Sequence, residues 1–190
     1  MNRRKKVVLI ALGALVANAA ALVYVHNEAA AGAAAPTAQT PQVLYDFNAL
    51  PDPVKRMLEQ IAAAAQSGEV ENLRPVFESN ELKPMVATDY VEDPIGFWKK
   101  ASADGTGRDV MAAMLNVLAS GYVRVGKGQD EMLVWPYFAE IDLAKLTPAQ
   151  EVELYRIVPP AEAIAMKKAG KYSHYRLGVS PSGVWQYFLQ

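Results

Sequence analysis

The chain has 190 residues, of which 52% are hydrophobic and 21% charged, a composition that supports one folded domain and excludes bulk disorder. The formal net charge is -1, but the part from Pro36 onward holds 15 Lys and Arg against 19 Asp and Glu, and this acidic balance argues against nucleic acid as a partner. The chain has no cysteine, which excludes disulfides, thiolate metal sites, a cysteine nucleophile and the lipidated cysteine of a bacterial lipoprotein.

The N-terminus carries the pattern of an export signal. Residues 2–6 read NRRKK, and the apolar run from Val7 to Val25 contains Asn18 as its only polar side chain. A basic flank before an apolar run is typical of a secretory signal, and the flank stays in the cytoplasm while the rest of the chain faces outward. The sequence therefore predicts a periplasmic or secreted protein, or one tethered to the inner membrane with its domain outside the cytoplasm.

Residues 1–25 are predicted to be either a cleaved signal peptide or an N-terminal membrane anchor. Cleavage would follow the small residues at 17–19, which read Ala-Asn-Ala. Without cleavage, residues 7–25 would form a helix of about 28 Å and contact the membrane, since a bilayer core is ~30 Å thick. Residues 26–43 are rich in Ala and Pro and predict a flexible tether, and residues 44–190 are predicted to be the folded domain.

The first half of the domain has the apolar spacing of amphipathic helices. A stripe with intervals of three and four residues predicts a helix that ends at Gly68, with Val54, Met57, Leu58, Ile61 and Ala65 on its inner face. Further helices are predicted over 69–78, from Asp93-Pro94 onward with Phe97 and Trp98 buried, and over 108–119. The inner face of this last helix is expected to carry Met111, Met114, Leu115 and Leu118.

The second half predicts strands with helices between them. Strands are expected over 122–125 and 131–141, and Thr147-Pro148-Ala149-Gln150 is a helix start with a capping box. Another helix should run from Pro160 to Gly170, and strands over 172–179 and 184–189 should flank a turn at 180–183. We therefore expect an α+β fold in one domain: N-terminal amphipathic helices with a small antiparallel sheet of about four strands, ending in a C-terminal β-hairpin. Its core should include Trp98, Met114, Leu118, Phe138 and Leu177.

Motifs for catalysis are scarce. The domain has one histidine, His174, and it lacks the serine-nucleophile and phosphate-loop motifs. The acidic loop 104–109 is better explained as a helix start than as a calcium site. Glu140 and Asp142 would share one side of a strand and could form an acid–base pair, although charges at a strand edge commonly serve to block aggregation. We predict no cofactor, no metal and no catalytic residue.

The terminal hairpin is the best candidate for a binding site. Alternation along the first strand places Tyr172, His174 and Arg176 on one face, and the second strand adds Trp185 and Tyr187. An imidazole, a guanidinium and aromatic rings together suit an anionic or sugar ligand, or an aromatic group of a protein partner. The alternative is a solvated sheet face whose aromatic residues pair across the strands.

These observations favour a non-catalytic binding or scaffold module of the cell envelope that engages an envelope protein or a cell-wall polymer. One alternative is an envelope hydrolase that uses a carboxylate or His174. Another is an accessory subunit of a membrane complex that acts through its N-terminal helix. The scarcity of paired titratable residues favours the binding module over the hydrolase.

Overall fold

The structure is a computed structural model that describes residues 40–190. The chain divides into two units, Met1–Thr37 and Ala38–Gln190, and the described residues all belong to the second. The predicted signal or anchor at 1–25 and nearly all of the tether at 26–43 therefore lie outside the described residues. Within 40–190, no helix combines the length and the apolar character needed to cross a membrane.

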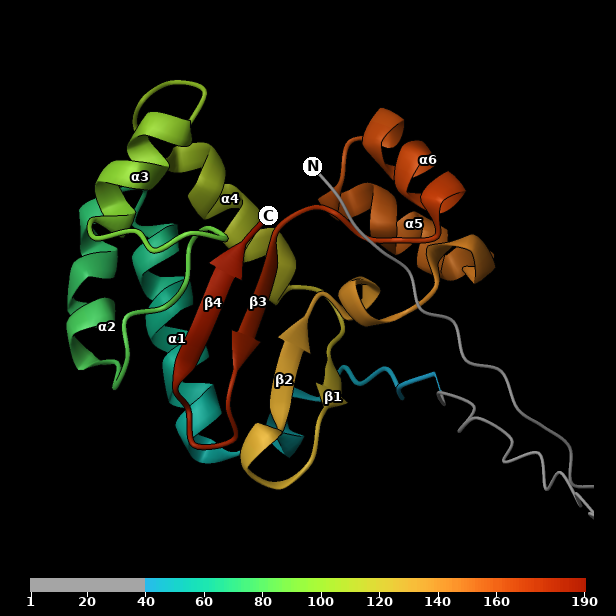
Figure 1. Cartoon of the computed structure of the whole chain (residues 1–190), viewed down its shortest axis with the longest axis horizontal. Coiled ribbons are helices and arrows are strands. Elements are labelled where there is room, and N and C mark those ends of the chain that lie inside the picture. Colours follow the sequence, from blue (N-terminus) through green and yellow to red (C-terminus); the bar gives the residue numbers. More distant parts are fainter. Residues whose placement is uncertain (1–39) are drawn as a thin grey trace, which may run out of the picture. The chain divides into compact units, whose positions relative to one another are not determined.

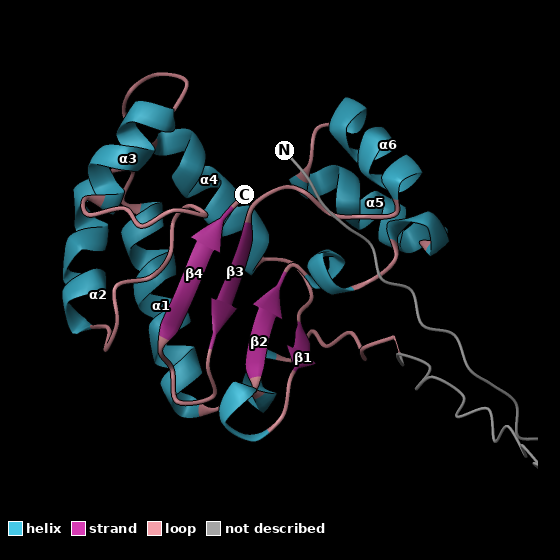
Figure 2. Cartoon of the chain, viewed as in Figure 1, coloured by secondary structure: helices cyan, strands magenta, loops and turns pink. Residues whose placement is uncertain are grey.

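A four-stranded antiparallel sheet organises the described part of the chain. Its strands follow one another in chain order: β1 (Val123–Val125), β2 (Met132–Trp135), β3 (Arg176–Val179) and β4 (Trp185–Leu189). The helices are α1 (Asp52–Gln66), α2 (Arg74–Ser79), α3 (Pro94–Ala101), α4 (Arg108–Leu118), α5 (Pro148–Ile157) and α6 (Pro160–Ala169). The first four precede the sheet, and α5 and α6 lie in the connection from β2 to β3 (Figure 2). The predicted α+β fold with a C-terminal hairpin is confirmed.

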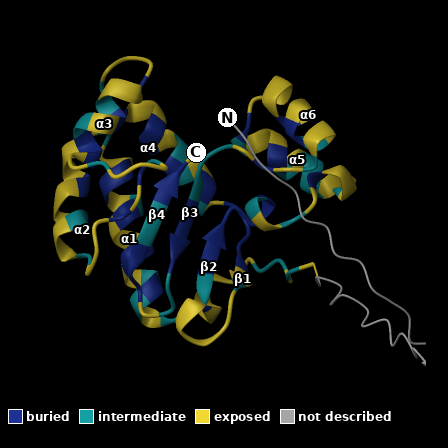
Figure 3. Cartoon of the chain, viewed as in Figure 1, coloured by how far each residue is buried: buried dark blue, intermediate teal, exposed yellow. Residues whose placement is uncertain are grey.

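The sheet buries apolar side chains on both faces. On one face Leu133, Leu177 and Phe188 pack in a core with α1, α3 and α4, which lie to the left of the strands and behind them in Figure 1. On the other face, Val123 and Val134 pack in a second core with residues of α5 and α6. Successive residues of a strand point to opposite faces, so the short strands supply both cores (Figure 3).

Both edges of the sheet are covered by single bridges from distant parts of the chain. At the β1 edge, the N–H groups of Leu44 and Tyr122 each donate to the other's carbonyl oxygen at 2.8 Å. At the β4 edge, the Met85 N–H donates to Gln186 O and the Phe188 N–H donates to Met85 O, both at 2.9 Å. Covered edges offer fewer free backbone groups for pairing with another chain.

The start signals of α5 and α6 are confirmed, whereas the side chain of Asp93 makes no capping hydrogen bond to α3. The Thr147 side chain accepts from the Gln150 N–H, and the Gln150 side chain accepts from the Thr147 N–H, which completes the capping box of α5. The stripe of α1 is buried at all five predicted positions, and Trp98, Met114, Phe138 and Leu177 lie in the core.

Two helix faces differ from the prediction. Leu115 and Leu118 of α4 are half-buried, and Val110 and Val117 take the inner positions beside Met111 and Met114. On α3, Phe97 is exposed and Ile95 is buried with Trp98. Each of these helices has apolar residues around more than one face, so the packing against its neighbours selects the buried stripe.

The predicted long strand over 131–141 is also wrong. β2 ends at Trp135, and residues 137–140 form a 3-10 turn after Pro136. Proline has no N–H to continue the ladder, which ends the strand here. Glu140 therefore lies in the turn and Asp142 accepts from the Ala144 N–H, so the two carboxylates do not share one side of a strand.

Candidate binding surface on the terminal hairpin

The hairpin of β3 and β4 contains an irregularity that decides which side chains are exposed. Leu177 pairs with Phe188 and Gly178 with Tyr187, but the next residue, Val179, pairs with Trp185. Gln186 is therefore an extra residue in β4, a β-bulge. A bulge reverses the alternation of side chains. Trp185 and Phe188 therefore both point to the face that packs on α1, α3 and α4, here called the helical face, while Tyr187 points to the opposite face.

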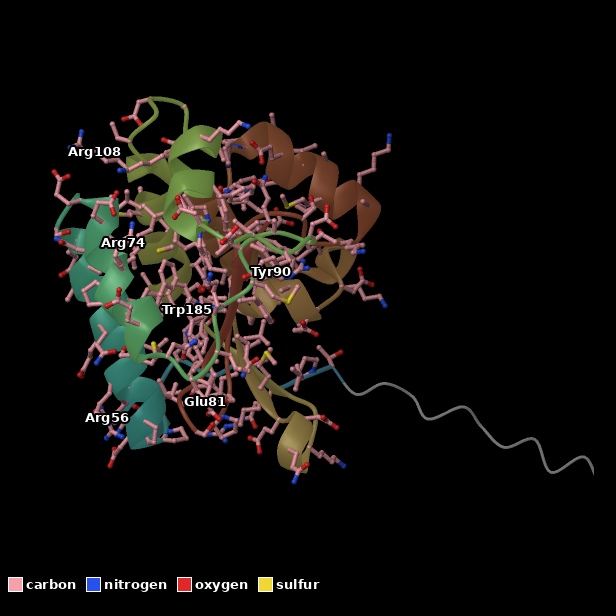
Figure 4. The ribbon with its side chains drawn as sticks, turned by 60° about the vertical axis from the view of Figure 1, so that its left-hand side comes forward. Arg56, Arg74, Glu81, Tyr90, Arg108 and Trp185 are labelled. Atoms are coloured by element: carbon pink, nitrogen blue, oxygen red, sulfur yellow. The ribbon has the colours of Figure 1, made fainter. Side chains whose placement is uncertain are left out.

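Trp185 is a core residue, which contradicts its predicted place beside Tyr187. Its ring stacks on Phe77 at a centroid distance of 5.2 Å and lies 6.4 Å from the ring of Trp98. Figure 4 shows it in the interior, away from the peripheral Arg56, Arg74 and Arg108. The side chain of Asn80 pairs with the backbone of Trp185, accepting from its N–H at 2.9 Å and donating to its carbonyl oxygen at 2.8 Å.

Tyr172 is likewise buried and does not lie on a strand. β3 begins at Arg176, and the preceding residues follow an irregular path. The Tyr172 hydroxyl donates to Tyr175 O at 3.0 Å, and its ring lies 6.4 Å from that of Phe138 in the second core. Burial raises the pKa of this phenol, so Tyr172 serves packing and offers no contact surface.

His174 lies near the C-terminus and the start of α6. Its Nδ1 atom is 3.8 Å from Glu162 Oε2 and 3.5 Å from the side-chain nitrogen of Gln190. Burial lowers the pKa of His174 while Glu162 raises it, and the net shift is downward, so the ring is largely uncharged at pH 7. The two neighbours of the His174 ring are therefore a carboxylate and a carboxamide.

Arg176 and Tyr187 do share a sheet face. The Tyr187 ring lies across Gly178, where a Cβ atom would collide with its Cε1 and Cζ atoms and come within 2.7 Å of Met132 Sδ. Burial raises the pKa of Tyr187 to about 12, with Glu140 acting in the same direction and Arg176 in the opposite one. We call this group, Met132, Glu140, Arg176, Gly178 and Tyr187, the Tyr187 surface.

Glu140 brings a negative charge to the Tyr187 surface. Desolvation by the surrounding protein raises the pKa of its carboxyl group, although the residue as a whole is exposed, and Arg176 lowers that pKa. Arg176 thus lowers the pKa of both Glu140 and Tyr187, although it forms no direct ion pair with Glu140. In Figure 1 no helix of the described residues lies in front of β3 and β4 on this side.

Sequence reasoning missed Glu140, Met132 and Gly178 as members of this surface. A small residue opposite an aromatic one across a hairpin is a usable signal for Gly178, because the ring needs the space. Nothing in the local sequence links Glu140 to Arg176, since a chain segment that includes α5 and α6 separates them.

The chemistry of the surface suits binding. The tyrosine ring offers an apolar face with a hydroxyl group at its edge, and arginine can hold a carboxylate through two parallel hydrogen bonds. Residues 40–190 contain no cluster of three or more His, Asp or Glu side chains arranged to hold a metal ion. Comparisons with protein families, with curated proteins and with solved structures find no match in any of the three.

Proposed function

We propose that this protein is a non-catalytic binding module of the cell envelope that engages a cell-wall polymer through the Tyr187 surface. The supporting observation is the register of the hairpin, in which Arg176 pairs with Leu189 and Gly178 with Tyr187, because this pairing puts Tyr187 on the same sheet face as Arg176. Placement in the envelope rests on the basic and apolar pattern of residues 2–25.

The proposed ligand is a glycan with isolated carboxylate groups. A sugar ring can stack on the exposed part of Tyr187, and a carboxylate can pair with Arg176. Glu140 can accept hydrogen bonds from sugar hydroxyl groups. A dense polyanion is less suitable, since the part of the chain from Pro36 onward carries more Asp and Glu than Lys and Arg.

Cosedimentation with purified, insoluble peptidoglycan tests the proposal. The full chain should sediment with the polymer, and Arg176→Gln and Tyr187→Leu should each weaken binding by about tenfold, the effect of removing one important contact. Leucine at 187 keeps an apolar cover over Gly178. Arg56→Gln and Phe97→Leu are matched controls, because both residues are exposed on α1 and α3, the helices that pack on the opposite face of the sheet.

Two results would contradict the proposal. Either the full chain stays in the supernatant, or the two variants at the Tyr187 surface bind as well as their controls. Release of soluble fragments from the peptidoglycan by the unmodified chain would instead favour the hydrolase. Loss of sedimentation in all four variants would point to a general defect in folding, and their melting temperatures would reveal it.

A further inference from the structure

A pocket of about 360 Å³ lies on the helical side of the sheet, away from the Tyr187 surface. Its walls come from the segment before α1, from α1 itself, from the end of α4 and the residues that lead from it to β1, and from β2. The lining residues are Tyr45, Phe47, Leu50, Leu58, Glu59, Ala62, Leu118, Ser120, Tyr122 and Trp135. Tyr122 and Trp135 belong to the core on the helical face, so this pocket and the Tyr187 surface are separate sites.

The three hydroxyl groups in the wall already donate to protein acceptors. The Ser120 hydroxyl donates to Val117 O at 2.6 Å, and the Tyr122 hydroxyl donates to Asp46 O at 3.3 Å. The Tyr45 hydroxyl donates to Glu153 Oε2 at 2.8 Å. A polar group pushed into this pocket would lose water without gaining a free partner, whereas a hydrocarbon group would lose nothing. The wall therefore favours an apolar ligand body.

The volume favours a chain or a pair of rings over one aromatic side chain. An apolar cavity of about 150 Å³ holds one benzene molecule, and ligand pockets span ~300–1,000 Å³. At about 360 Å³, the pocket would be left more than half empty by a single ring. An anchoring side chain of a protein partner is thus a poorer match than a hydrocarbon chain.

The mouth of the pocket carries one carboxylate. Glu59 is exposed on α1, and within residues 40–190 it forms no ion pair. Tyr45 and Phe47 are also exposed there, at 63% and 42% of their surface. A ligand whose chain fills the pocket would leave its polar head beside Glu59, where an anionic head is repelled.

We propose that this pocket binds the hydrocarbon chain of a small amphiphile that has an uncharged or cationic head. The paired polar atoms of the wall select the chain, and Glu59 discriminates between heads. This site is independent of the proposed binding of a cell-wall polymer, because it shares no residue with the Tyr187 surface.

Calorimetric titration with two ligands of equal chain length tests the proposal. The full chain is titrated with dodecyltrimethylammonium and with dodecanoate, both below micelle-forming concentrations. The cationic ligand should bind more tightly. Ala62→Phe, which fills the pocket from α1, should weaken its binding at least tenfold, while Gln60→Phe, at an exposed position on the other side of the same helix, should not. Glu59→Gln should reduce the preference for the cationic head by about two- to fivefold, as expected for an exposed charge.

The filling variant isolates the pocket from the apolar run at residues 7–25, which both variants retain. Equal binding by Ala62→Phe and Gln60→Phe would overturn the proposal. Tighter binding of dodecanoate than of the cationic ligand would overturn the selectivity for the head. If Ala62→Phe does not fold, as judged by its thermal melt, Leu118→Phe replaces it, because this change fills the pocket from the opposite wall. It should then weaken binding of the cationic ligand at least tenfold relative to the control variant.

Discussion

Glu153 is a single residue that connects three parts of the fold. From α5, its carboxylate accepts hydrogen bonds from the hydroxyl groups of Tyr45 at 2.8 Å and Tyr137 at 3.0 Å, and from the Gly121 N–H at 3.1 Å. Tyr137 is fully buried, and this burial is the main cause of the raised pKa of its phenol. Tyr45 and Glu153 raise the same pKa further. The phenol therefore stays protonated and remains a donor that needs an acceptor.

Replacing Glu153 by alanine should lower the free energy of unfolding by about 1–3 kcal/mol, because a buried hydroxyl loses its acceptor. Val152→Ala is the matched control, since Val152 is exposed on the same helix and its loss should cost less than about 0.5 kcal/mol. Urea denaturation measures the free energy of unfolding of both variants. A double variant with Tyr137→Phe should lose less than the sum of the single changes, and strict additivity would contradict the proposed network.

At the scale of the element, the β3–β4 hairpin shows how one extra residue changes a surface. The turn forms as the sequence predicts, with the Gly183 N–H donating to Ser180 O at 2.9 Å and a positive φ of 87° at Gly183. The bulge at Gln186 then moves Trp185 into the core and leaves Tyr187 on the opposite face. The same hairpin thus buries Trp185 in the core and leaves Tyr187 half-buried on the opposite face.

Gly178→Ala should displace the Tyr187 ring and lower the free energy of unfolding by about 1–3 kcal/mol, as overpacking does. Combining it with Tyr187→Ala removes the collision, so the double variant should be more stable than the sum of the single changes implies. Thermal or urea unfolding is measured for the unmodified chain, the two single variants and the double variant, which together form a double-mutant cycle. A coupling energy close to zero would show that the ring does not depend on the glycine.

At the scale of the whole molecule, residues 38–190 form one unit whose sheet is packed on both faces. Leu44 is the first described residue that hydrogen bonds to the sheet, through Tyr122. Its backbone contacts attach the N-terminal end of the unit to β1.

Limited proteolysis of the full chain should cut first within residues 29–42 and leave a resistant fragment that begins near Tyr45. The reason is the composition of this stretch, which is rich in Ala and Pro and has no large apolar residue to bury. Mass spectrometry of the resistant fragment locates the cut. A first cut within α1 or the sheet, with residues 29–42 intact, would show that this stretch is protected.

The sequence by itself determined features that depend on neighbours in the chain. Three such features follow from residues close together in the chain: the capping box at Thr147 and Gln150, the turn at 180–183 and the buried stripe of α1. So does the α+β class, because the periodicity of apolar residues changes from helix to strand along the chain.

Only the tertiary structure decided which surfaces these elements present. The bulge at Gln186, the burial of Tyr172, the proximity of Arg176 to Glu140 and the pocket between Tyr45 and Trp135 each depend on segments far apart in the chain. A shift of one residue in strand pairing reverses every side chain beyond it, and that pairing is set by packing against the helices. Of the five residues predicted to form a binding face on the terminal hairpin, only Arg176 and Tyr187 lie together on the face away from α1, α3 and α4.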